Sequence, residues 1–182
     1  MNNPTESSPS GMVLFSHGHE SGPEGLKIRR LRPVAENLGW DTEAIDYRDL
    51  RDDPAARSAR LVEWMDRATG PVVLVGSSMG GWVSMDAAEK RPVAGLFLMA
   101  PALFMEHRVP GGETRESYQP RCPRCCVVHG WSDSVIPWQN SLKFAQAGGT
   151  DLHLIDADHR LEGAITALET LLGAFLEQAG GQ

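Results

Sequence analysis

The chain has 182 residues, and its content of 41% hydrophobic and 23% charged residues is ordinary for a globular protein. This length fits one domain, which would bury roughly 70% of the surface of the unfolded chain and so needs no disulfide or metal to fold. Acidic residues outnumber basic ones by 24 to 17, which gives a net charge of −7. That balance argues against a nucleic-acid-binding protein, because such proteins usually present a basic face.

The start of the chain lacks the features of an export signal. Residues 1–11 are rich in Asn, Pro, Ser and Thr and contain neither a basic start nor an apolar stretch. We expect them to form a disordered tail before a single domain over residues 12–178. No apolar run approaches the ~18 residues that a membrane span requires. With an odd count of three cysteines, these features predict a cytoplasmic protein.

Short segments rich in β-forming residues alternate with segments of helical periodicity. The predicted strands are Met12–Ser16, Glu43–Tyr47, Val72–Gly76, Leu96–Ala100, Cys125–His129 and Leu152–Asp156. The predicted helices are Gly25–Leu38, Ala55–Ala68, Gly80–Glu89, Pro137–Ala147 and Leu161–Gln178. Several strands are apolar at consecutive positions, which is typical of strands covered on both faces. The alternation predicts an α/β fold: a doubly wound, mainly parallel sheet of about six strands with helices on both faces.

Three local features qualify this pattern. Pro33 could kink or end the first helix. Residues 105–120 are polar and contain Pro and Gly, so we expect a surface loop there. The one basic cluster (Lys27, Arg29, Arg30 and Arg32) lies on the first predicted helix, and we interpret it as a solvated helix face.

A serine follows the third predicted strand on a sharp turn. Residues 76–80, Gly-Ser-Ser-Met-Gly, fit the G-x-S-x-G pattern, with an apolar strand before it and a helix after it. Such a turn forces its tip, Ser78, to positive φ, and side chains two positions away would collide with the tip. Ser78 then lies at a helix N-terminus, which favours negative charge. Ser78 is therefore the predicted nucleophile, and a glycine-rich turn without chemistry is the alternative.

A serine hydroxyl needs a base, and the base needs an acid that orients it. In this kind of sheet the acid and then the histidine follow the serine along the chain. Asp133 and His159 each come just after a later predicted strand, in that order. Asp156 and Asp158 compete for the role of acid, and either group alone could be an ordinary turn aspartate or loop histidine.

The developing oxyanion requires two backbone N–H donors. One is expected from Met79, the residue after the nucleophile. The loop after the first strand should supply the other, and there we assign His19, with Gly18 as the alternative. His17 is interpreted as a residue that braces this loop.

These motifs together resemble the α/β-hydrolase superfamily. The residues that carry the resemblance are Phe15–His19, Gly76–Gly81, His129–Pro137 and the pair Asp158-His159, and it extends over Met12–Leu176. The chain is most similar to small, capless bacterial serine esterases and to the thioesterase-like and dienelactone-hydrolase-like groups. The resemblance implies a Ser78, His159 and Asp133 triad and the loss of the two usual antiparallel first strands. Dienelactone hydrolases proper carry a cysteine nucleophile, so the serine argues against that activity.

The expected reaction is hydrolysis of a small ester or thioester through an acyl-enzyme, with no cofactor and no metal. Only about two dozen residues separate the fourth and fifth predicted strands, which leaves no room for a lid. The pocket should be shallow and open. Its candidate lining residues are Trp82, Phe104, Trp131 and Trp138.

Three alternatives stay open. An α/β-hydrolase fold can serve as a non-catalytic binding protein, and an amidase or peptidase would use the same triad. Cys122, Cys125 and Cys126, with His129, could form a metal or redox site, but no second cysteine pair completes a zinc set. We therefore interpret the cysteines as small residues of the core. The oligomeric state is open as well.

Overall fold

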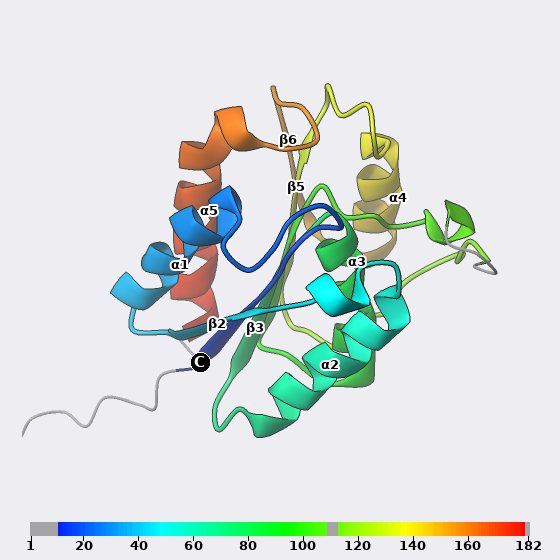
Figure 1. The fold of residues 1–182 in the computed structure, drawn as a ribbon. Helices are drawn as coiled ribbons and strands as arrows, with labels where there is room; N and C mark the ends of the chain where they lie inside the picture. Colours follow the sequence, from blue (N-terminus) through cyan, green and yellow to red (C-terminus); the bar gives the residue numbers. More distant parts are fainter. Residues whose placement is uncertain (1–10, 109–112, 181–182) are drawn as a thin grey trace, which may run out of the picture.

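The computed structural model describes residues 11–108 and 113–180. Its centre is a six-stranded sheet in the order β2-β1-β3-β4-β5-β6, in which every neighbouring pair is parallel (Figure 1). The strands are β1 (Met12–Ser16), β2 (Asp41–Ile45), β3 (Val72–Ser77), β4 (Gly95–Met99), β5 (Cys125–Gly130) and β6 (Asp151–Ile155). This sheet confirms the predicted fold class, and the described residues contain no antiparallel strand.

Helices cover both faces of the sheet. They are α1 (Leu26–Asn37), α2 (Pro54–Arg67), α3 (Met79–Lys90), α4 (Trp138–Gly148) and α5 (Ile165–Gly180). Helices α1 and α5 lie on one face, and α2, α3 and α4 lie on the other (Figure 1). Three short 3-10 helices, η1 (Arg48–Leu50), η2 (Glu106–Arg108) and η3 (Glu162–Ala164), lie in the connections. Within the described segments no helix combines the length and apolarity needed to cross a membrane.

Side-chain alternation along the central strands builds two cores. Val73 and Val75 of β3 join the core beneath α1 and α5, whereas Leu74 joins the core beneath α2, α3 and α4. Successive side chains of a strand point to opposite faces, so a strand that is buried on both sides must be apolar at consecutive positions. This requirement explains the apolar runs in the sequence.

The boundaries differ from the predicted ones where the sequence lacks an apolar signal. The edge strand β2 begins at Asp41 and ends at Ile45, because its first residues are solvent-exposed or only half-buried. Helix α1 continues through Pro33, so the suggested break was wrong. Helix α5 begins only at Ile165, because Leu161 adopts a φ of 58° and a 3-10 turn follows it.

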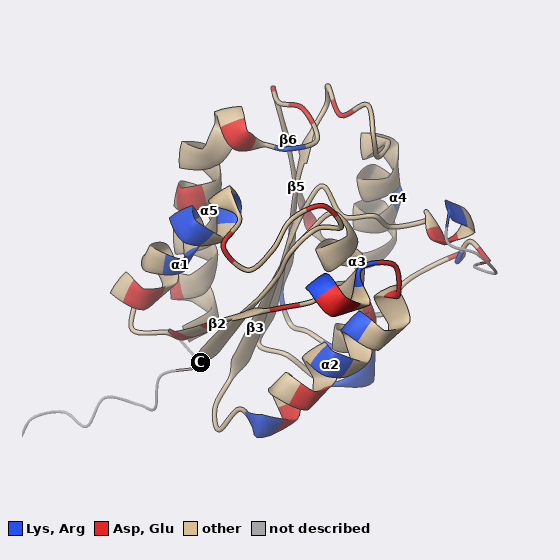
Figure 2. Cartoon of the chain, viewed as in Figure 1, with Lys and Arg blue, Asp and Glu red and all other residues tan. Residues whose placement is uncertain are grey.

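Some predicted features fall partly outside the described residues. Residues 1–10 of the expected tail and residues 109–112 of the expected surface loop are among them. Acidic and basic residues are interspersed along α1 and α2 (Figure 2). Arg30 of the basic cluster donates to Glu169 of α5 at 2.8 Å. Arg29 and Arg30 are exposed, as expected for a solvated helix face, whereas Lys27 and Arg32 are half-buried.

Helix α3 begins directly against the loop that follows β1. A methyl group on Gly80 would run into the carbonyl groups of Ser16 and His17, and one on Gly76 would run into the carbonyl of Gly80. The two glycines are therefore required by contacts between backbone segments, rather than by the collision with Ser78 that the sequence predicted. The start of α3 is thus held closely against the carboxyl end of β1.

We predict that Gly80→Ala lowers the free energy of unfolding by about 1–3 kcal/mol or more, because the backbone of β1 cannot yield to the added methyl. Gly173→Ala is the control. Its methyl would lie 3.6 Å from Val34, and alanine is the better residue inside a helix, so stability should rise by about 0.5–1 kcal/mol. Urea unfolding measures both. Equal stability of Gly80→Ala and wild type would contradict the rigid contact.

Candidate active site

Ser78 occupies the turn between β3 and α3 in a strained conformation, with φ 56° and ψ −120°. Its N–H donates to the Met99 carbonyl at 3.0 Å, and its own carbonyl accepts from the N–H groups of Gly81, Trp82 and Ala102. Positive φ costs a residue with a side chain about 1–3 kcal/mol. These four backbone hydrogen bonds hold the serine in that conformation at the N-terminus of α3.

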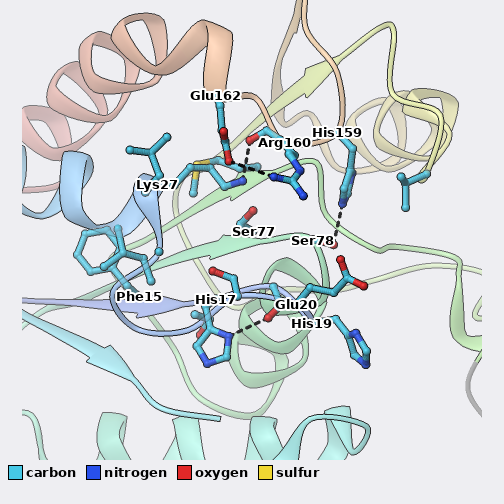
Figure 3. Close-up of a pocket in the computed structure, with 18 of the residues that line it drawn as sticks. Phe15, His17, His19, Glu20, Lys27, Ser77, Ser78, His159, Arg160 and Glu162 are labelled. Carbon is cyan, nitrogen blue, oxygen red and sulfur yellow. Dashed lines mark hydrogen bonds and ion pairs between the residues drawn. The ribbon is translucent and has the colours of Figure 1, made fainter. Parts of the chain in front are cut away.

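The structure brings Ser78, His159 and Asp133 together from the ends of three strands. The Ser78 hydroxyl lies 3.0 Å from Nε2 of His159, and Nδ1 of His159 lies 2.7 Å from Oδ2 of Asp133. Figure 3 shows His159 pointing at Ser78 across the mouth of a pocket. In this arrangement His159 can accept the hydroxyl proton at Nε2 while donating from Nδ1 to the carboxylate.

The Asp133 side chain is fully buried and accepts four hydrogen bonds. Oδ1 accepts from the N–H groups of Val135 and Ile136, both at 2.8 Å, and Oδ2 accepts from His159 and from Nε2 of His129 at 3.0 Å. Burial alone would raise the pKa of this carboxyl, but the backbone N–H groups and His159 outweigh it and lower the pKa. Asp133 is therefore held as a carboxylate.

The two aspartates that competed for this role have other partners. Asp156 accepts from the indole N–H of Trp131 at 3.2 Å. Asp158 accepts from the backbone N–H groups of Arg160 and Leu161 and so shapes the turn that carries His159.

His129 is the residue of the site that sequence reasoning missed. Its ring is completely buried at the end of β5, with Nε2 facing Asp133 and the Ile136 carbonyl, and Nδ1 lying 2.7 Å from the Ser141 hydroxyl. Burial lowers its pKa against the opposing pull of Asp133, so the ring is a neutral donor to the carboxylate. The sequence placed His129 in the motif His129–Pro137, but no pattern in it predicted a hydrogen bond from His129 to Asp133.

The loop after β1, from which one oxyanion donor is expected, lies next to Ser78. Gly18 lies beside Ser78, because a methyl on it would be 3.5 Å from the Ser78 Cβ. The His19 side chain turns away to Asp52, with 2.6 Å between Nε2 and the carboxylate oxygen. Met79 is the first residue of α3, so its N–H has no acceptor one turn earlier in the helix. The roles of the Met79 and His19 N–H groups remain predictions.

A buried cluster of three side chains braces this loop. Nδ1 of His17 donates to the Gly18 carbonyl at 2.8 Å, and Nε2 accepts from the Tyr47 N–H at 3.1 Å. Arg57 is buried behind it and donates to the His17 carbonyl at 3.4 Å, with its guanidinium over the Tyr47 ring. His17 thus lies where a bracing residue is expected, and it does not reach Ser78.

A cavity of about 700 Å³ opens beside Ser78. It lies between the β1 loop, the start of α1 and the turn that carries His159. Its apolar lining includes the side chains of Phe15, Ile28, Val75 and Met99. Its polar lining includes Lys27, Arg160 and Glu162 (Figure 3). Ser78 and His159 both line it, so a substrate in the cavity would contact them.

The four aromatic residues that the sequence suggested for the pocket are not among those that line this cavity. The Trp82 indole donates to Glu106 at 2.9 Å, and Phe104 is buried against Tyr118. Trp131 is 56% exposed. Trp138 begins α4, on the sheet face opposite α1. The cavity instead lies on the α1 side.

The cysteines lie away from this site, at the other end of β5. In the described ranges no group of three or more His, Cys, Asp or Glu side chains is arranged to hold a metal ion. Burial raises the pKa of the Cys126 thiol to about 12, which matches its interpretation as a core residue.

Residues 13–124 match the family model described as the alpha/beta hydrolase family. The chain belongs to this family. It is also 32% identical to a Xanthomonas campestris pv. campestris protein assigned to the alpha/beta hydrolase superfamily. The TM-score is 0.78, with 92% of this chain and 99% of that one covered.

Two other similar proteins are more distant in sequence. The mouse palmitoyl-protein thioesterase ABHD10 is 25% identical over 82% of this chain and 69% of its own. The structure of Est1E from Butyrivibrio proteoclasticus superposes with a TM-score of 0.82 at 14% identity, covering 98% of this chain and 92% of that one. At such identity the Est1E likeness shows the shared alpha/beta hydrolase fold.

We predict that His17 makes the stability of the fold depend on pH. Burial lowers the pKa of His17, with the nearby Arg57 charge acting in the same direction and the Gly18 carbonyl opposing. The unfolded state then takes up a proton first, so stability falls as the pH drops below the unfolded value of about 6.5. Urea unfolding between pH 7.5 and about 5 should show this slope.

His17→Gln should reduce that slope, and the exposed control His107→Gln should keep it. Part of the slope should persist in His17→Gln, because burial lowers the pKa of His129 as well. If stability depended on pH equally in His17→Gln and in wild type, His17 would have the same pKa in the folded and unfolded states, which would contradict the prediction.

Proposed function

We propose that this protein is a serine hydrolase that cleaves small esters or thioesters through an acyl-enzyme intermediate. The observation that carries the proposal is the pair of hydrogen bonds that links Ser78 to His159 and His159 to the buried Asp133. Ser78 and His159 also line the cavity. The named thioesterase and esterase relatives support acyl transfer as the reaction class. Ser78 is the proposed nucleophile, His159 the base and Asp133 the acid that orients it.

In the first half-reaction the Ser78 oxygen bonds to the carbonyl carbon while its proton moves to Nε2 of His159. The N–H groups of Met79 and His19 would donate to the oxyanion that forms. As this intermediate collapses, the bond to the leaving oxygen or sulfur breaks, and His159 returns the proton to that atom.

Water completes the cycle. His159 removes a proton from a water molecule, the water oxygen attacks the acyl carbon, and the bond to Ser78 breaks as His159 reprotonates the serine. The Asp133 carboxylate stabilises the imidazolium in both halves without taking its proton. No atom outside the chain, the substrate and water is required.

The cavity favours short acyl chains over long ones. Its apolar surface from Phe15, Val75 and Met99 is interrupted by the charged side chains of Lys27 and Arg160. A palmitoyl chain would have to pass these charges or extend into solvent, and either arrangement forfeits apolar burial.

A p-nitrophenyl ester series from acetate to palmitate, with matched thioesters, tests the proposal. We expect the highest kcat/KM for short chains and labelling of the protein by a fluorophosphonate probe. Ser78→Ala should lose the label and about 10⁴-fold or more in kcat. Ser84→Ala, which removes a buried hydroxyl of α3, should keep both. Undiminished labelling or turnover in Ser78→Ala would sink the assignment, and turnover of amides alone would favour an amidase.

His129 should act as a positioning residue for Asp133. His129→Leu removes one hydrogen bond to a charged group, so we expect kcat for p-nitrophenyl acetate to fall about tenfold or more with little change in KM. Ser141→Ala leaves the bond between His129 and Asp133 in place and should have a smaller effect. A His129→Leu protein that melts earlier but retains full kcat would show that the residue serves stability alone.

A further inference from the structure

The cavity contains a cationic side chain that the proposed mechanism does not use. Lys27, in the first turn of α1, lines the cavity, with Arg160 lying between it and His159 (Figure 3). The sequence placed it in a cluster interpreted as a solvated helix face. Unlike Arg29 and Arg30, which are exposed, Lys27 is partly buried. Its ammonium group therefore belongs to the cavity rather than to the outer surface of α1.

The Lys27 ammonium has three N–H donors and makes one hydrogen bond, to the Arg160 carbonyl at 2.7 Å. Within residues 11–108 and 113–180 no carboxylate lies within 4.0 Å of it. Glu162 is paired with the Arg160 guanidinium at 3.9 Å. Burial lowers the pKa of Lys27, and the Glu162 charge opposes that shift. A partly buried cation with two unused donors favours an anionic ligand.

The placement of the leaving group decides which part of the substrate reaches Lys27. Nε2 of His159 must protonate the leaving atom, so that half of the substrate lies against His159. The acyl half would then extend into the rest of the cavity, where Phe15 and Lys27 lie (Figure 3) and which Met99 also lines. Glu20 also lines the cavity, near Ser78 and His19 (Figure 3), and would repel a negative charge there.

We propose that the preferred substrates are esters or thioesters whose acyl part ends in a carboxylate, which the Lys27 ammonium binds. This inference rests on the proposed function and names its substrate class. The short apolar wall of the cavity accommodates the methylene chain of the acyl part. The Lys27 ammonium at the end of that wall binds the carboxylate at the end of that chain.

Two N-acetylcysteamine thioesters test this inference, because adipoyl and hexanoyl chains of equal length differ only in a terminal carboxylate. Wild type should favour the adipoyl thioester in kcat/KM by about tenfold or more, the worth of a charge-assisted hydrogen bond. Lys27→Met should abolish that preference while still hydrolysing the hexanoyl thioester. Lys27→Arg should retain much of it, and Lys143→Met, which removes an exposed lysine over the Phe104 ring, should leave it intact.

Calorimetric binding of both thioesters to Ser78→Ala, with and without Lys27→Met, separates this inference from the proposed function. Absence of turnover in wild type would defeat the hydrolase proposal, while Lys27-dependent binding of the adipoyl thioester would still support the anion subsite. Equal slowing of both thioesters in Lys27→Met would overturn it and indicate that Lys27 acts only through the Arg160 carbonyl. A preference that follows a carboxylate in the thiol half would overturn the acyl assignment.

Discussion

The turn at Ser78 is the constraint on which the rest of the site depends. Positive φ at this serine is unfavourable by itself, and four backbone hydrogen bonds to β4, α3 and Ala102 hold it there. Gly80 then allows α3 to lie against the carbonyls of Ser16 and His17. Ser78, the proposed nucleophile, and the loop of the expected His19 donor are thus positioned by one contact between backbones, which no side chain can loosen by changing rotamer.

The buried Asp133 is the second constraint, and it links the site to the far side of the sheet. Its four donors keep it ionised and fix the direction in which His159 points. One of those donors, His129, is itself held by Ser141 of α4. The orientation of the proposed base therefore depends on how α4 packs, although α4 contributes nothing to the cavity.

The parallel sheet could be predicted because strands buried on both faces must be apolar throughout. The proximity of Ser78, Asp133 and His159 followed from the same topology, since the carboxyl ends of parallel strands share one edge. The contact of His129 with Asp133 depends on the turn through Val135 and Ile136, and no periodicity in the sequence reveals that turn. The cavity walls were unpredictable for a related reason: hydropathy shows that a strand is covered, but not on which face the connecting loops leave a space.

Arg57 and Lys27 are fully and partly buried cations near the β1 loop. The N–H donors that each leaves unused distinguish a cation that only stabilises the fold from one that can bind a ligand. Among the described residues Arg57 has no carboxylate partner, yet each of its three nitrogens donates to a backbone carbonyl and its plane lies over Tyr47. Its charge is satisfied inside the fold, so Arg57 braces the loop and needs no ligand. Within that same part of the chain Lys27 likewise has no carboxylate partner, but it makes a single hydrogen bond. Because Lys27 lines the cavity beside Ser78, the proposed substrate carboxylate would regain part of the free energy lost in desolvating that ammonium.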